Sequence, residues 1–188
     1  MNVNKMFWGV RALFYKLKFE QIKMPSYIGK PTYISNGYGV NCGKRVRIYP
    51  GLRVEIVNKD SKIYIGNNVS IGQNVHMVSY NDSLVINDDV TISGNVLITN
   101  CDHEYKNIDI SILAQQLITK KTVIGKGTFI GYGAIIQAGT ILGEHCVVGA
   151  NSVVRGEFPD YCVIVGSPAK IIKKYNIKNE KWELTNNE

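Results

Sequence analysis

The stretch that decides the fold runs from Val123 to Val154 and reads VIGKGT FIGYGA IIQAGT ILGEHC VVGANS VV. An aliphatic residue recurs at every sixth position, a small residue stands two places before it, and glycine usually follows it. The aliphatic positions are Ile124, Ile130, Ile136, Leu142, Val148 and Val154. This period excludes an amphipathic helix and is typical of a short strand and a tight corner, repeated. One such strand cannot bury its apolar side alone, so the pattern predicts stacked coils, a parallel β-solenoid.

The same period continues toward the N-terminus. Six apolar positions upstream have the same spacing: Ile65, Ile71, Met77, Ile86, Ile92 and Ile98. A three-residue insertion separates the third from the fourth. Farther upstream two phases compete. One runs through Cys42, Ile48 and Val54, and the other through Ile28, Ile34, Val40, Val46 and Leu52. We favour the first phase, because Cys42 is followed by glycine, as in the later repeats.

Composition agrees with one folded domain. The chain has 188 residues, of which 45% are hydrophobic and 20% charged, enough for a sizeable core. It contains no run of eighteen or more apolar residues, so no transmembrane helix is predicted. Four cysteines without a C-x-x-C pair favour a reducing compartment over a disulfide framework. The repeat divides the chain into an amphipathic helical segment at residues 1–27, a solenoid at residues 28–169 with a loop at 99–121, and a basic tail at residues 170–188.

The net charge of +7 lies at the two ends of the chain. Residues 1–30 hold six basic residues and one acidic residue, and residues 170–188 hold five and three. The 139 residues between them hold eleven of each sign. These ends favour anionic partners such as the phosphates of a coenzyme or a membrane surface. Because the solenoid itself is neutral, nucleic acid is not an expected partner.

The longest interruption of the repeat is where a functional site is expected. Ile98 and Ile124 are 26 residues apart, two more than four repeats, and long loops on rigid scaffolds commonly carry function. The loop opens with Asp102, His103 and Glu104. Neutral imidazole can accept a proton from an attacking hydroxyl group, which makes His103 a candidate catalytic residue. Asp102 falls where a residue would point inward, so the chain is expected to have left the solenoid there.

Four stretches resemble the hexapeptide-repeat acyltransferases, which have a left-handed β-helix. They are NCDHEY at Asn100–Tyr105, TFIGYGAIIQAGTILG at Thr128–Gly143, VVGANSVV at Val147–Val154, and IVGSPAKIIKK at Ile164–Lys174. The sequence is most similar to the branch with galactoside and maltose O-acetyltransferases and the O-acetyltransferases of surface-polysaccharide gene clusters. The resemblance implies left-handed coils, acetyl-coenzyme A as the co-substrate, and His103 as the general base.

The resemblance also implies a groove for the acyl donor. Tyr132 stands where relatives have a small residue whose backbone N–H contacts the thioester carbonyl, so its amide is expected to stabilise the oxyanion. Relatives often have Trp where this chain has Phe129. The positions expected to bind acyl-coenzyme A are Phe129, Gly131, Tyr132, Ala150, Arg155, Lys170 and Lys173, and the lysines are expected to meet the coenzyme's phosphates.

For the acceptor, the resemblance points to Asn74, which matches an asparagine that holds the sugar hydroxyl in relatives. A corner asparagine is also common as a simple turn residue. Asp102 and Glu104 are the other expected acceptor-binding residues, and either can instead orient the imidazole. Relatives are homotrimers with active sites between subunits. The resemblance therefore implies a homotrimer whose acceptor is a saccharide, linked to a nucleotide or to a lipid.

The sequence predicts no metal site. His76 and His103 are 27 residues apart, and His103 and His145 are 42 apart. The cysteines supply no ligand set at zinc spacing either. These spacings separate the chain from the zinc-dependent γ-class carbonic anhydrases, which resemble it in the repeat alone.

The N-terminal segment permits two interpretations. Phe7, Val10, Phe14 and Leu17 share one face of a predicted helix, while lysine and arginine lie elsewhere. The helix is expected either to cap the open end of the solenoid or to lie on a membrane as a basic interfacial helix.

The function expected from these features is O-acetylation of a sugar hydroxyl in bacterial O-antigen or capsular polysaccharide biosynthesis, by direct transfer from acetyl-coenzyme A. The first alternative is N-acetylation of a nucleotide-linked aminosugar, and the second is a non-catalytic solenoid that serves as a scaffold. The expected location is the cytoplasm, with peripheral association with the inner membrane left open.

Overall fold

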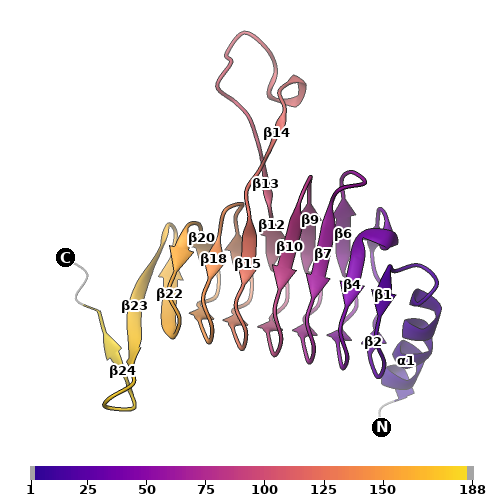
Figure 1. The fold of residues 1–188 in the computed structure, drawn as a ribbon, viewed down its shortest axis with the longest axis horizontal. Helices are drawn as coiled ribbons and strands as arrows, with labels where there is room; N and C mark the ends of the chain where they lie inside the picture. Colours follow the sequence, from indigo (N-terminus) through magenta and orange to yellow (C-terminus); the bar gives the residue numbers. More distant parts are fainter. Residues whose placement is uncertain (1–2, 186–188) are drawn as a thin grey trace.

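The computed structural model describes residues 3–185, with side chains from residue 5 onward. The first two residues of the predicted helical segment and the last three of the predicted tail lie outside the described residues. Short strands stack in three parallel sheets, A, B and C, which form the three faces of a column (Figure 1). The chain visits A, then B, then C, and then returns to A one coil farther along. The predicted β-solenoid is confirmed.

Each sheet takes one strand from each coil. Sheet A contains β1 (Gln21–Ile22), β4 (Val40–Cys42), β7 (Lys62–Ile65), β10 (Ser83–Ile86), β15 (Thr122–Ile124), β18 (Ile141–Leu142) and β21 (Glu157–Phe158). Sheet B contains β2 (Tyr27–Ile28), β5 (Arg47–Ile48), β8 (Ser70–Ile71), β11 (Thr91–Ile92), β16 (Phe129–Ile130), β19 (Val147–Val148) and β22 (Cys162–Gly166). Sheet C contains β3 (Tyr33–Ile34), β6 (Arg53–Ile56), β9 (His76–Ser79), β12 (Leu97–Thr99), β17 (Ile135–Ile136) and β20 (Val153–Val154).

The residues of the six-residue period form the core. Ile65 pairs with Ile86, and Ile86 pairs with Ile124, so the same inward position stacks from coil to coil. These side chains are buried. Fully burying an aliphatic side chain of this size stabilises the fold by about 1.5–3 kcal/mol. The column is thus held by inward stacks that no single coil could bury.

The upstream phase that we favoured is confirmed, since Cys42 pairs with Ile65 and Val54 with Met77. Ile28 and Ile34 of the competing phase are part of the same columns one coil earlier, because they pair with Ile48 and Val54. Val40 is in a different column, since it pairs with Ile63. The short 3-10 helix η1 (Gly37–Gly39) absorbs the two extra residues between the coils. The solenoid therefore begins at β1, upstream of the boundary predicted at residue 28.

The helix α1 (Val3–Tyr15) covers the N-terminal end of the column (Figure 1). In sheet B, the N–H groups of each coil donate to carbonyls of the next coil. Because no coil precedes the first one, the Ile28 carbonyl faces the open N-terminal end. The Arg11 guanidinium donates to that carbonyl at 3.1 Å. Trp8 packs on Tyr27 with ring centroids 5.9 Å apart, and Ala12 is buried. The helix thus caps the solenoid, as one of the two interpretations predicted.

The opposite end closes with strands where a basic tail was predicted. β23 (Ala169–Asn176) pairs antiparallel with β22, and β24 (Lys181–Leu184) pairs antiparallel with β23. The turn at Gly166 reverses the chain with a φ of 104°, which favours glycine.

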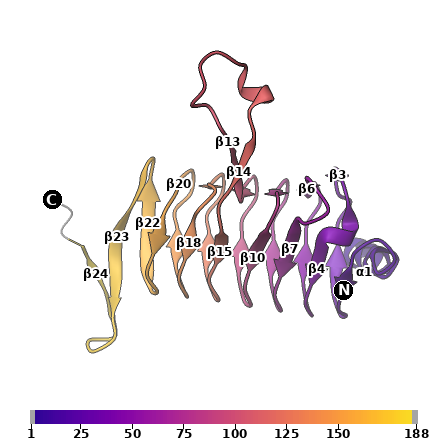
Figure 2. The same cartoon turned by 45° about the horizontal axis from the view of Figure 1, so that its top comes forward.

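The interruption of the repeat is a protruding arm. β13 (Cys101–His103) and β14 (Leu117–Thr119) form an antiparallel pair, and the loop between them carries the 3-10 helix η2 (Ile112–Ala114). In both views the arm stands clear of the coils (Figures 1 and 2). It leaves the column between sheets C and A.

The cysteines are free thiols. Burial raises the pKa of the Cys42 thiol to about 12, which keeps it protonated as a packing group.

Among the residues the structure describes, no helix has the length and hydropathy needed to cross a membrane.

Candidate active site

The base of the arm is fixed by Asn100, which is fully buried. Its side-chain oxygen accepts a hydrogen bond from the Tyr80 N–H at 2.8 Å. Its amide nitrogen donates to the carbonyls of Tyr80 and Asp82 at 3.3 and 3.4 Å. Sequence reasoning did not assign Asn100 a role. The available signal was the alternation of Val96, Ile98 and Asn100, which puts an amide at an inward position.

From this base β13 carries His103 outward. His103 pairs with Leu117 across the hairpin, and Asp102 pairs with Ile118. Asp102 has therefore left the solenoid interior, as predicted. The exposed side chain of His103 lies on a cleft of 430 Å³. The lining of this cleft is Asp102, His103, Glu104, Tyr105, Lys106, Ile118, Lys120 and Arg155.

The two acids beside His103 have different partners. An Asp102 carboxylate oxygen lies 3.8 Å from the Arg155 guanidinium. Glu104 accepts the N–H groups of Tyr105 and Lys106 at 3.0 and 3.2 Å. The backbone hydrogen bond from Tyr105 is the main cause that lowers the pKa of Glu104. Glu104 thus shapes its own turn, and Asp102 is the acid held by a cation from the column.

Arg155 lies on the His103 side of the column. It follows β20, at the corner where the chain passes from sheet C to sheet A, which we call the C–A corner. We had expected Arg155 among the acyl-coenzyme A-binding residues. The structure brings it to Asp102 instead of to Tyr132.

Tyr132 lies at the other edge of sheet C. It follows β16, at the turn from sheet B to sheet C, which we call the B–C corner. The Ala134 N–H donates to the Gly131 carbonyl at 3.3 Å, and Gly133 has a φ of 70°, which together describe a type II turn. The Tyr132 N–H has no partner within residues 3–185.

Close packing of coils explains the glycine in this turn. A Cβ on Gly131 would lie 2.6 Å from the Ala150 nitrogen in the next coil. The Tyr132 carbonyl also accepts the Asn151 N–H at 2.8 Å. Gly131, Tyr132 and Ala150 are therefore stacked at one corner.

The bulky side chain of Tyr132 leans toward the preceding coil. Its hydroxyl group is hydrogen-bonded to the Asn95 side chain, and its ring lies over Gly94. Both contacts are on the side opposite Ala150. The neighbouring Phe129 is 43% exposed on the outer face of sheet B. The tyrosine side chain, which replaces a small residue, thus adds bulk on the side of Gly94 and Asn95. It does not cover the side of the corner where Tyr132 adjoins Ala150.

The two lysines lie farther along the same face. Lys170 pairs with Val165 and Lys173 pairs with Val163, so β23 places both at the C-terminal end of sheet B. The Val165 side chain is next to Gly149, one residue before Ala150. The expected donor residues other than Arg155 thus follow one line along sheet B and its corner.

Asn74 belongs to the B–C corner as well. It follows β8, has a φ of 54°, and its N–H donates to the Pro50 carbonyl at 3.1 Å. Asparagine is favoured at such a left-handed position. The structure therefore brings Asn74 to the side of Tyr132 and not to that of His103.

A charged cluster on the outer face of sheet C was not anticipated. The His76 Nε2 atom lies 2.9 Å from a Glu55 oxygen, and the Arg53 Nε atom lies 2.7 Å from the same oxygen. Burial raises the pKa of Glu55, but the hydrogen bonds from Arg53 and His76 outweigh it, and the net shift is downward. His76 is thus partnered by a carboxylate, and within the described residues no group of three or more His, Cys, Asp and Glu side chains could hold a metal.

The candidate site is therefore in two halves. His103, Asp102, Glu104 and Arg155 lie at the C–A corner, whereas Tyr132, Ala150 and Asn74 lie at the B–C corner. Sheet C separates the two halves within one chain.

Six-residue repeats such as those that form these three parallel sheets are shared with a known family of transferases. Residues 121–156 match the family described as bacterial transferase hexapeptide (six repeats). The chain is 38% identical over 160 residues, 81% of each protein, to the Escherichia coli (strain K12) protein named Putative lipopolysaccharide biosynthesis O-acetyl transferase WbbJ. The chain belongs to the hexapeptide-repeat acyltransferases with a left-handed β-helix.

Solved structures share the fold. A mutant of AntD, an N-acyltransferase from Bacillus cereus in complex with dTDP and coenzyme A, is 21% identical with a TM-score of 0.77, over 90% of this chain and 91% of that one. A maltose O-acetyltransferase from Clostridium difficile 630 is 20% identical with a TM-score of 0.59, over 92% and 79%. A galactoside acetyltransferase in complex with coenzyme A is 18% identical with a TM-score of 0.58, over 99% and 90%.

Proposed function

We propose that this protein transfers an acetyl group from acetyl-coenzyme A to a sugar hydroxyl in the biosynthesis of bacterial O-antigen or capsular polysaccharide. The observation that carries the proposal is His103, presented on the hairpin arm over an open cleft. Support for the pathway comes from the WbbJ protein, whose name places it in lipopolysaccharide biosynthesis.

The B–C corner has features that suit acyl-coenzyme A. It offers a backbone N–H at Tyr132 that has no partner among the described residues, a close-packed turn at Gly131, and cations at Lys170 and Lys173. The N–H is expected to stabilise a thioester oxyanion, and the lysines are expected to attract phosphate groups. The coenzyme would supply the activated acetyl group.

In the proposed reaction, His103 accepts the proton of the acceptor hydroxyl as that oxygen attacks the thioester carbonyl. The Tyr132 N–H stabilises the resulting oxyanion. When the intermediate collapses, the carbon–sulfur bond breaks and the imidazolium returns its proton to the leaving thiolate. Asp102 and Asn74 are proposed to hold the saccharide. Transfer is direct, with no acetylated enzyme.

The reaction needs both halves of the site, which sheet C separates within one chain. We therefore propose a homotrimer in which His103 of one subunit faces the B–C corner of its neighbour. The outer face of sheet C, which lies between both halves, is the proposed contact.

An N-acetyltransferase acting on a nucleotide-linked aminosugar is the second candidate. The observation that favours it is the TM-score of 0.77 to AntD, whose structure holds dTDP and coenzyme A. An amine attacks in its neutral form and needs less help from a base. His103→Ala should therefore retain more activity on an aminosugar than on a hydroxyl acceptor.

We propose a cytoplasmic location, where acetyl-coenzyme A is available, and a position at the inner membrane if the saccharide is lipid-linked. The acceptor is then a nucleotide-linked or lipid-linked sugar met on the cytoplasmic side.

The test is release of thiol from acetyl-coenzyme A across a panel of nucleotide-linked and lipid-linked sugars and aminosugars. With the correct sugar, His103→Ala should lower kcat by about 10²–10⁴-fold. The matched control is His145→Asn, because His145 lies at the corner between sheets A and B with a φ of 50° that asparagine tolerates. If no acceptor releases thiol and the coenzyme does not bind, the protein is a scaffold and the proposal is wrong.

A further inference from the structure

The helix α1 keeps an apolar face that the solenoid does not use. The helix contacts the first coil through Trp8, Arg11 and Ala12, and the Lys5 ammonium lies 5.8 Å from the centroid of the Tyr27 ring. The apolar side chains left exposed on the helix and the turn after it are Met6, Phe7, Val10, Leu13, Phe14 and Leu17. Phe14 is 65% exposed and Leu17 is 78% exposed. A cap alone needs no such face, because a capping helix normally turns polar residues outward.

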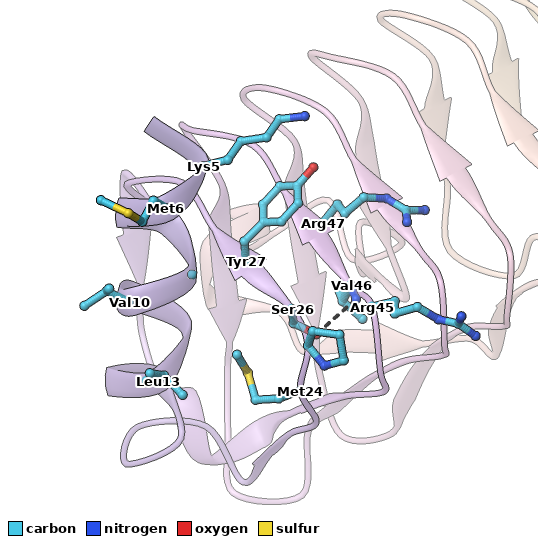
Figure 3. Close-up of a pocket in the computed structure, with 12 residues that line it drawn as sticks. Lys5, Met6, Val10, Leu13, Met24, Ser26, Tyr27, Arg45, Val46 and Arg47 are labelled. Carbon is cyan, nitrogen blue, oxygen red and sulfur yellow. Dashed lines mark hydrogen bonds between the residues drawn. The ribbon is translucent and has the colours of Figure 1, made fainter. Parts of the chain in front are cut away.

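A groove of 470 Å³ continues this face toward the strands. Its apolar walls come from α1, through Val10 and Leu13, and from the first coils, through Met24 and Val46. Figure 3 shows Met6 and Val10 pointing away from the strands, while Lys5, Arg45 and Arg47 extend along the strand side. An apolar groove therefore opens between a helix and a rim of cations.

The charge around the groove has one sign. Glu20 is the only acidic residue among residues 1–30, and Lys62 and Asn41 bind its carboxylate. Lys16 and Lys18 follow the helix in the sequence and add to the positive charge of this end of the chain. A second copy of this chain would bring the same cations against themselves, which disfavours a self-complementary contact. An anionic surface with an apolar interior complements both the charge and the apolar face.

We propose that α1 docks this protein on an anionic phospholipid bilayer. The exposed apolar side chains enter the boundary between headgroups and acyl chains, and Lys5, Lys16, Lys18 and Arg45 meet the lipid phosphates. Arg47 stays with the column, because its guanidinium donates to the Asn68 side chain and carbonyl at 2.9 Å. This docking goes beyond the proposed acetyl transfer and stands without it. The helix thus has two faces, of which one closes the solenoid and the other binds lipid.

The apolar part is tested by flotation of the full chain with vesicles of phosphatidylethanolamine and phosphatidylglycerol. The wild type should float with these vesicles and not with pure phosphatidylcholine. The triple variant Phe7→Ser, Phe14→Ser and Leu17→Ser should lower the partition coefficient by about tenfold or more. The matched control is Ile108→Ser with Leu113→Ser, which removes apolar side chains that are even more exposed, on the arm, and should leave flotation unchanged.

The electrostatic part is tested by replacing Lys5, Lys16 and Lys18 with Gln. Flotation should weaken, as it should for the wild type in high salt. Replacing Lys178 and Lys181 with Gln at the other end should have no effect. Thiol release with a water-soluble acceptor should be unchanged in all these variants, which separates lipid docking from catalysis.

Three outcomes would overturn the proposal. The first is a wild type that stays in the lipid-free fraction, and the second is an apolar variant that floats as well as the wild type. The third is an apolar variant whose assembly in solution has a smaller mass than the wild-type assembly. The last outcome would show that a second copy covers the face.

Discussion

Tyr132 is a position where the backbone, and not the side chain, is proposed to act. The second place of its type II turn favours proline, which keeps the turn but has no N–H. Tyr132→Pro should therefore fold and lower kcat by about 10²–10³-fold, the usual effect of losing one oxyanion donor. Tyr132→Ala keeps the N–H and should retain most of kcat. Thiol release measures both.

Lys126→Pro is the control for proline itself. Lys126 holds the same place in the turn from Gly125 to Thr128, where Gly127 has a φ of 68°. That turn lies at the corner between sheets A and B, away from both halves of the site. Wild-type kcat in Tyr132→Pro would show that the amide is not the oxyanion donor.

Asn100 should matter for stability as well as activity. Asn100→Ala leaves the Tyr80 N–H without its partner at the foot of the arm, and an unsatisfied buried donor costs about 1–3 kcal/mol. Urea unfolding should show a loss of that size. Asn107→Ala, in the exposed loop of the arm, should change the unfolding free energy by less than about 0.5 kcal/mol. Equal losses in both variants would contradict the role given to Asn100.

Single residues were predictable where the repeat defines their place. Tyr132 and Ala150 follow inward residues of regular coils, so their common corner is implied by the spacing. Arg155 also follows a regular coil, but its partner Asp102 comes from the arm, where no period fixes the geometry. The role of Asn100 was not predictable either, because its partners lie in another coil. They are the Tyr80 N–H and the carbonyls of Tyr80 and Asp82.

Hydrogen bonds between corners link successive coils and depend on pH. The Asp88 carboxylate accepts the Asn67 N–H at 2.6 Å. This backbone bond, followed by one from the Asn67 side chain, lowers the pKa of Asp88 below its ordinary value of 3.8. A depressed folded-state pKa means that the stabilisation is present above the unfolded-state pKa and is lost as the pH falls through the folded-state value.

Asp88→Asn should therefore lower the free energy of unfolding at neutral pH, by less than about 1 kcal/mol because solvent screens this exposed site. The gap between wild type and variant should close as the pH falls below about 4. Urea unfolding across pH measures it. Asp109→Asn, on the exposed arm, should show no such gap. A gap that widens in acid would contradict the assignment.

Among the elements, regular strands were predictable and irregular ones were not. The period fixes β15 to β20 through inward residues. It does not predict the arm, because β13 and β14 lie in an insertion outside the repeat. These two strands pair antiparallel, with Asp102 opposite Ile118. In β23, Lys170 and Lys173 suggested a solvated tail, yet the strand pairs with β22 on one side and with β24 on the other, because lysine side chains can stand on the exposed face of a strand.

The two-half site predicts that inactive subunits can complement each other. Chains with His103→Ala lack the base, and chains with Tyr132→Pro lack the oxyanion donor. When equal amounts are co-assembled into trimers, one interface in four should combine an intact His103 with an intact B–C corner, so activity should return to about a quarter of wild type. Thiol release by the mixture, compared with each variant alone, measures this.

Co-assembly is essential to that result, so the two variants mixed after folding and without subunit exchange are the control and should stay inactive. A site formed within one chain would always carry one of the two defects. No recovery in verified mixed trimers would therefore contradict the inter-subunit site.

The closed ends determine how long the column can become. Parallel coils expose unpaired strand edges at both ends, and such edges can join identical molecules head to tail without limit. Here the Arg11 guanidinium donates a hydrogen bond to the Ile28 carbonyl at one end. At the other end, β23 pairs antiparallel with β22, so a parallel coil cannot pair with that strand. The two caps therefore act against polymerisation, and they allow a protein built like a segment of a fibre to remain a discrete particle.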